Sequence, residues 1–277
     1  MKRIDSHQHF WSLSRGDYAW LTPDLAALYR DYGPSDLAPF LAAHGICGTV
    51  LVQAAQTDAE TQFLLDVAGA THWVKGVVGW VDMAAPDAPE RIARLSRQAV
   101  LKGLRPMLQD MDDDDFILRG DVQPALVAMA DCGLRLDALV RPRHLPRLTA
   151  LRRRFADLPI VIDHAAKPDI AGGALARWRA DLMAVAADGL TCCKVSGLVT
   201  EAGAGWTVEA LRPVVDTILE VFGPDRVMWG SDWPVVTLAV GYGEWVATTE
   251  ILLSGLDAAG RSAVLGGTAI RFYGLEV

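Results

Sequence analysis

Two histidines stand two residues apart near the N-terminus, within the segment Asp5–His9 (DSHQH). Side chains alternate between the two faces of a β-strand, so His7 and His9 are expected to point the same way. Two neighbouring imidazoles are half of the ligand set that zinc commonly takes in proteins. An isolated pair of this kind is a weak signal, so it predicts a metal site only together with further ligands.

Two more residues of similar chemistry follow apolar runs later in the chain. His164 ends the run Ile160–His164, and Asp232 comes shortly after the run Val227–Gly230. Either residue alone would more often be structural, as a buried histidine or a turn aspartate. In a parallel barrel, however, the carboxyl ends of all strands meet at one mouth. The three histidines and Asp232 are therefore expected to converge on one point.

Eight such β-rich runs alternate with amphipathic helical segments. The predicted strands are Arg3–Ser6, Thr49–Gln53, Val74–Trp80, Gly103–Met107, Arg135–Val140, Ile160–His164, Cys192–Ser196 and Val227–Gly230. Eight strand–helix repeats predict an α/β protein, a closed (β/α)8 barrel of the TIM type, with one domain over residues 1–277. An open doubly wound sheet is the alternative, and it is less favoured because no GxGxxG follows any of the strands.

The composition limits the classes of partner. The chain has 277 residues, of which 51% are hydrophobic and 22% charged, and its formal net charge is −8. An acidic chain repels phosphate backbones, so we expect no nucleic-acid partner. No apolar run approaches the roughly 20 residues of a membrane helix, and the N-terminus lacks the apolar core of a secretion signal. We read the four cysteines as reduced thiols of a cytoplasmic protein, and a homo-oligomer stays open.

Six short motifs, spread over nearly the whole chain, carry a wider resemblance. They are Asp5–Trp11 (DSHQHFW), Lys102–Arg105 (KGLR), Asp163–Pro168 (DHAAKP), Lys194–Leu198 (KVSGL), Gly230–Val235 (GSDWPV) and Arg271–Leu275 (RFYGL). With these motifs the chain resembles the amidohydrolase superfamily, in the branch of sugar-lactone hydrolases and pyrone-dicarboxylate lactonases. The resemblance implies a distorted (β/α)8 barrel with His7 and His9 as metal ligands. It implies His164 as a further ligand or carbonyl-polarising group, and Asp232 as the catalytic carboxylate.

The resemblance predicts one divalent ion, with zinc as the first candidate. Arg105 and Pro106 stand where a bridging lysine would end the fourth strand, and Asp137 stands where a histidine would end the fifth. A second metal therefore lacks ligands. Asp232 and His164 are expected to complete the shell of His7 and His9. The alternative is that the ion is dispensable, because three histidines could also clamp an oxyanion without it.

The expected reaction is hydrolysis of a cyclic ester. Such a reaction needs a positioned water, a base and donors for the developing oxyanion. Asp232 is the candidate base, and His164 is a candidate donor to the carbonyl oxygen. Substrate contacts are expected from the other strand ends, at Gln53, Trp80, Asp82, Arg105, Asp137, Lys167, Lys194 and Ser196.

The expected partner is a small sugar lactone, opened to its aldonic acid. A dicarboxylate needs arginine forks, and Arg105 is the one arginine placed at a predicted strand end. We therefore favour a neutral lactone, with L-fuconolactone or L-rhamnonolactone as the first candidates from the resemblance. One alternative is a decarboxylase of an unsaturated or aromatic acid in the same superfamily. The other is a non-catalytic barrel that binds metal or sugar.

Overall fold

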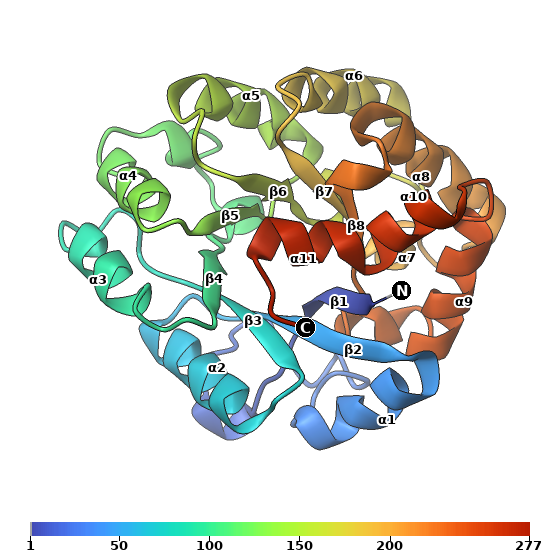
Figure 1. The fold of residues 1–277 in the computed structure, drawn as a ribbon, viewed down its shortest axis with the longest axis horizontal. Coiled ribbons are helices and arrows are strands. Elements are labelled where there is room, and N and C mark those ends of the chain that lie inside the picture. The colour runs from blue at the N-terminus through green and yellow to red at the C-terminus, as the bar shows by residue number, and fades with distance from the viewer. Residues whose placement is uncertain (1) are drawn as a thin grey trace.

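The computed structural model describes residues 2–277 and contains a sheet of eight parallel strands (Figure 1). The strands lie side by side in chain order, each hydrogen-bonded to the next. This arrangement confirms the predicted (β/α)8 barrel. Its strands are β1 (Arg3–Gln8), β2 (Ile46–Val52), β3 (Val74–Gly79), β4 (Leu101–Leu104), β5 (Arg135–Ala138), β6 (Ile160–Ile162), β7 (Cys192–Val195) and β8 (Val227–Trp229).

The segment after β8 completes the ring by pairing with β1. The amide of His9 donates to the carbonyl of Trp233 at 2.7 Å, and the amide of Asp232 donates to the carbonyl of His7 at 2.8 Å. The buried carboxylate of Asp5 accepts from the amide of Ser231 at 2.8 Å. The first strand and the segment after the last strand are therefore locked together at the mouth of the barrel.

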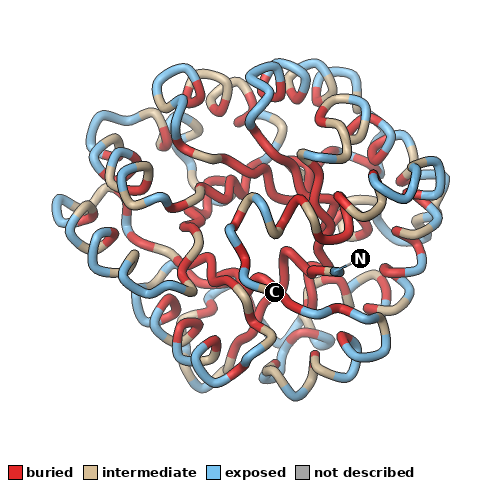
Figure 2. The backbone as a smooth tube through the Cα atoms, viewed as in Figure 1, coloured by how far each residue is buried: buried red, intermediate tan, exposed pale blue. Residues whose placement is uncertain are grey.

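Helices surround the sheet. The strands inside this ring are buried, whereas the outward faces of the helices are exposed (Figure 2). Side-chain caps start several helices: Thr57 accepts from the amide of Glu60, and Thr207 from that of Ala210. The helices are α1 (Pro34–His44), α2 (Asp58–Ala70), α3 (Ala88–Leu95), α4 (Gln123–Asp131), α5 (Leu145–Arg154), α6 (Leu175–Ala186), α7 (Leu198–Glu201), α8 (Val208–Phe222), α9 (Tyr242–Leu252), α10 (Ala258–Ser262) and α11 (Thr268–Tyr273).

The C-terminal helix α11 covers one end of the barrel (Figure 1). Its Ala269 and Tyr273 pack in one buried cluster with Ile4 of β1 and Val161 of β6. The sequence patterns predicted neither α11 nor the short α7. Both are too brief to show a helical hydrophobic period, so only their packing defines them.

The sequence placed the end of the sixth strand at His164, whereas β6 ends at Ile162. The difference arises because His164–Lys167 adopt positive φ angles and leave the extended conformation. None of the helices within residues 2–277 combines the length and the apolarity of a membrane span.

Candidate active site

His7 and His9 lie at the carboxyl end of β1, with ring centroids 4.9 Å apart. The Nδ1 atom of His9 is 2.7 Å from the carbonyl oxygen of Val52 at the end of β2. Because a carbonyl oxygen only accepts, this Nδ1 carries a proton, and in the neutral ring the lone pair is therefore on Nε2. The neighbouring strand thus fixes both the orientation and the tautomer of His9.

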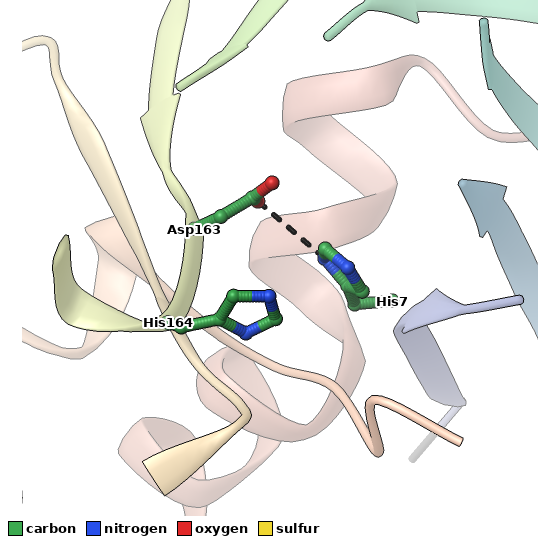
Figure 3. Close-up of side chains that lie close together, drawn as sticks. All are labelled: His7, Asp163 and His164. Atoms are coloured by element: carbon green, nitrogen blue, oxygen red, sulfur yellow. Dashed lines mark ion pairs between the residues drawn. The ribbon is translucent and has the colours of Figure 1, made fainter. Parts of the chain in front are cut away.

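His164 reaches the site from a left-handed turn after β6. The φ angles of His164–Lys167 lie between 51° and 62°, a conformation that costs roughly 1–2 kcal/mol for each residue with a side chain. The indole of Trp178 donates to the carbonyl of Ala165 at 2.7 Å and holds the turn. The His164 ring centroid comes to lie 4.5 Å from that of His7 (Figure 3). Backbone strain here serves to aim a side chain at the site.

Asp232 lies at the centre of the histidine cluster. Its Oδ1 atom is 3.3 Å from Nε2 of His9, 3.7 Å from Nε2 of His7 and 3.8 Å from Nε2 of His164. Burial alone would raise the pKa of Asp232, but the imidazoles of His164, His9 and His7, as cations and hydrogen-bond donors at acidic pH, hold it below its ordinary value. The carboxylate is therefore ionised in the middle of three ring nitrogens.

Two of these imidazoles are held in the neutral form. Burial lowers the pKa of His164 to about 4, against the opposing effect of Asp232 and Asp163. Burial and the ammonium of Lys194 lower the pKa of His7 well below its ordinary value. Near neutral pH both rings offer a lone pair, which a metal ligand or proton acceptor requires.

Gly197, which follows β7, makes room for two of these groups. Its φ is +61°, and a methyl group there would come within 2.6 Å of Nδ1 of His164 and 3.1 Å of Oδ2 of Asp232. The neighbouring Ser196 hydroxyl lies 2.9 Å from the same Nδ1. The end of β7 thus supplies a polar contact to the imidazole together with the space that the ring needs.

A cavity of about 270 Å³ opens above the cluster. His7 is completely buried beneath it, beside Asp163 (Figure 3). Five residues proposed from sequence line the cavity: His9, His164, Asp232, Arg105 and Lys167. The others in its wall are Trp20, Ala54, Met107, Gln109, Asp110, Leu139 and Val235.

The remaining predicted substrate contacts do not line the cavity. Trp80 and Asp82 line a separate small recess. Gln53, Asp137, Lys194 and Ser196 are fully buried and do not line the cavity. In this structure none of these six residues lines the cavity: Gln53, Trp80, Asp82, Asp137, Lys194 and Ser196.

Lys194 is the centre of a buried ion network under the cavity floor. Its Nζ atom is 2.6 Å from Oδ2 of Asp137, 3.0 Å from Oδ1 of Asp163 and 3.2 Å from Nδ1 of His7. Tyr273 of α11 donates its hydroxyl proton to Asp137 at 2.6 Å. Contacts between polar side chains thus extend from the covered end of the barrel to the histidine cluster.

Arg105 joins this network to the cavity. Its guanidinium contacts Oδ2 of Asp163 at 3.4 Å and Nε2 of His7 at 3.2 Å, and it donates to the carbonyl of Gln53. Its buried Nε has no hydrogen-bond partner within residues 2–277. Arg105 is therefore largely committed to protein groups, and its Nε–H is left without a partner among them.

The sequence missed most of the apolar cavity wall. Met107 and Leu139 were inside predicted strands but looked like ordinary core residues. Trp20 lies in an irregular segment without periodicity. One usable signal existed, since loops that follow barrel strands build the mouth, and Trp20 lies in the first of them.

The donor groups of the cluster fit a zinc ion. Two sets of ligand atoms, His7–His9–Asp232 and His7–Asp163–His164, each lie within 4.8 Å of one another. Imidazole nitrogen and carboxylate oxygen are common zinc ligands. The Val52 carbonyl that orients His9 is the kind of outer contact that metal-bound histidines make.

Known proteins resemble this chain over nearly its whole length. The family model described as Amidohydrolase matches residues 4–275. The chain belongs to the amidohydrolase family. This amidohydrolase is 47% identical over 280 residues to the L-fucono-1,5-lactonase of Burkholderia ambifaria, covering 99% of the chain and 96% of the relative. It is 41% identical over 285 residues to the L-fucono-1,5-lactonase of Burkholderia multivorans, again covering 99% and 96%.

Solved structures share the fold over the full chain. A crystal structure of a Burkholderia multivorans amidohydrolase with bound zinc superimposes on this amidohydrolase with a TM-score of 0.95. The two are 40% identical, and the match covers 100% of each chain. Zinc therefore binds in a structure closely similar to this amidohydrolase.

Proposed function

We propose that this amidohydrolase hydrolyses a neutral sugar lactone to the aldonic acid, with L-fucono-1,5-lactone as the first candidate. The observation that carries the proposal is the ionised Asp232 carboxylate among three imidazoles at the floor of a small cavity. The lactonase activity named for the relatives supports the substrate class. Free thiols at all four cysteines support the cytoplasmic location that we also propose.

Different residues of the chain carry out different steps of the proposed reaction. Asp232 accepts a proton from water as the water oxygen attacks the lactone carbonyl, and it returns a proton to the ring oxygen when the C–O bond breaks. The guanidinium of Arg105, which lines the cavity, stabilises the negative charge that develops on the carbonyl oxygen. One water is consumed, and one hydroxyl and one carboxylic acid form.

We propose that His7, His9, His164 and Asp232 hold one zinc ion. When bound, the ion supplies Lewis-acid polarisation of the lactone carbonyl. The two ligand sets and the tautomer fixed at His9 support this assignment.

Elemental analysis tests the zinc site on protein purified without chelator. We expect about one zinc per chain in the wild type and little in His7→Ala/His9→Ala, because imidazoles supply the nitrogen ligands. The matched control is His72→Ala, which removes an exposed histidine and should retain the zinc. Equal zinc in the wild type and the double variant would show that the ion binds elsewhere.

The charge of the cavity favours a neutral substrate. Two carboxylates, Asp110 and Asp232, line it together with the cations Arg105 and Lys167. Arg105 is held by protein groups, and the Lys167 ammonium lies 3.7 Å from Glu201. These two carboxylates would repel a dianionic substrate. The guanidinium of Arg105 is not free to bind a substrate carboxylate through two N–H groups.

Steady-state kinetics test this preference for neutral lactones. The expected kcat/KM for L-fucono-1,5-lactone exceeds that for 2-pyrone-4,6-dicarboxylate by about 10²-fold or more, since unpaired like charges cost several kcal/mol. A higher kcat/KM for the dicarboxylate would reverse the assignment of substrate charge.

Gly197→Ala is expected to lower kcat/KM for the lactone roughly 10²-fold, because the new methyl group displaces the His164 ring and Asp232. Gly45→Ala is the matched control: its φ is +64°, but no atom lies within 4 Å of the added Cβ position. Both variants carry the strain of a left-handed alanine, and only the first crowds the site. Equal kcat/KM in the two variants would contradict this role of Gly197.

A further inference from the structure

The loop between β1 and α1 forms part of the cavity mouth through Trp20. Trp20 is 37% exposed, although it is a large aromatic residue, and it is the one tryptophan that lines the cavity among residues 2–277. A tryptophan ring at the edge of a polar cavity offers an apolar surface with a hydrogen-bonding edge. Packing alone therefore does not explain the position of Trp20.

The indole of Trp20 is fixed by contacts on separate elements. Its Nε1 donates to the carbonyl of Ala54, just after β2, at 2.8 Å. Its ring meets that of Trp11 in an edge-to-face contact, with centroids 5.5 Å apart. The side chain is thus oriented before any ligand arrives, which lowers the entropy cost of binding.

A buried carboxylate anchors the surrounding loop. Glu60 of α2 accepts the hydroxyl proton of Tyr18 at 2.5 Å and the amide proton of Ala54 at 3.0 Å. Tyr18 lies two residues before Trp20, and Ala54 is the residue that Trp20 itself contacts. The Glu60 side chain therefore holds both the loop that carries Trp20, through Tyr18, and the segment that the indole contacts, through Ala54.

The apolar side chains of Met107 and Leu139 line the same cavity as Trp20, and His9 and Asp232 supply polar atoms to it. A sugar lactone likewise has apolar and polar surfaces, with C–H groups on the faces of its ring and oxygens along its edge. Aromatic rings cover C–H surface, and the polar groups at the floor are left for the reacting ester.

We propose that Trp20 is a substrate-binding residue whose indole covers the C–H surface of the bound lactone ring. This inference rests on the proposed function and deepens it, because it assigns sugar recognition to the loop after β1 rather than to the strand ends.

The test compares Trp20→Ala and Trp20→Phe with the wild type on L-fucono-1,5-lactone. A contact that is equally strong in the bound substrate and the transition state affects KM and leaves kcat unchanged. We expect Trp20→Ala to raise KM about 10-fold with kcat within about 3-fold of the wild type. Trp20→Phe keeps an aromatic face without the N–H group and should recover most of the affinity.

Two further measurements separate recognition from folding. The dissociation constant of the product L-fuconate, measured by calorimetry, should rise in Trp20→Ala in parallel with KM. Trp206→Ala is the matched control, because Trp206 is half-buried in a groove separate from the cavity, and its KM should match the wild type.

An unchanged KM in Trp20→Ala, or an equal rise in Trp206→Ala, would overturn the role of Trp20 while lactone hydrolysis by the wild type stands. A wild-type enzyme that opens no sugar lactone would instead overturn the proposed function, and the role of Trp20 would fall with it.

Discussion

Asp232→Asn is expected to fold normally and to lose about 10²–10⁴-fold in kcat on the sugar lactone, the usual contribution of a general base. The amide keeps the shape of the side chain but cannot accept the proton of the attacking water. It also places N–H donors where Nε2 atoms of three histidines surround a carboxylate oxygen. Both changes act on the reacting atoms, so kcat should fall by far more than KM changes.

The pH dependence sharpens this prediction. The surrounding imidazoles hold the pKa of Asp232 below its ordinary value, so the base is ionised throughout the neutral range. The loss in Asp232→Asn should therefore be similar at pH 6 and pH 8. Asp82→Asn is the matched control, since Asp82 follows β3 but lines a separate recess, and it should keep wild-type kcat. A near wild-type kcat in Asp232→Asn would place the base on another residue.

Lys194→Met is expected to lower the free energy of unfolding by about 3–5 kcal/mol, because it leaves buried carboxylates without their cation. Lys194 pairs with Asp137 and Asp163, and all three are completely buried. Urea unfolding at neutral pH measures the change. Lys75→Met, at a half-buried position on β3, is the control and should cost far less.

A double variant distinguishes the ion network from simple loss of packing. Lys194→Met/Asp137→Asn removes one of the stranded charges, and Asp163 keeps its contact with Arg105. The double variant should therefore unfold at higher urea concentration than Lys194→Met alone, which reports coupling between the two residues. A double variant less stable than the single one would show that the charges do not stabilise each other.

The histidine–aspartate cluster could be predicted from sequence because simple geometry produces it. Alternation along β1 puts His7 and His9 on one face, and parallel strands bring their carboxyl ends together. The same alternation predicted Lys194 at the cavity, but its side chain is completely buried and does not line it. Lys194 and Ser196 share a face of the same segment, but Lys194 lies one layer deeper, against Asp137. Periodicity predicts the face of the strand on which a side chain lies, but not how deep in the barrel that side chain lies.

Two features depend on contacts that no local pattern contains. The left-handed turn at His164–Lys167 includes no glycine, and Trp178 and the packing around it hold the turn. The position of Trp20 depends on Glu60, which lies 40 residues later in the sequence and accepts from both Tyr18 and the end of β2. Such tertiary contacts override the weak preferences of the local sequence.

The cavity beside Asp232 explains why a small lactone suits this barrel, and one assay tests that claim directly. Proton release in weakly buffered solution is followed when the enzyme meets a panel of neutral aldono-1,4- and 1,5-lactones, with carbon dioxide measured in parallel. The account predicts catalysed release of one proton per lactone opened, fastest for L-fucono-1,5-lactone, with no carbon dioxide formed. No catalysed proton release from any lactone in the panel would contradict it.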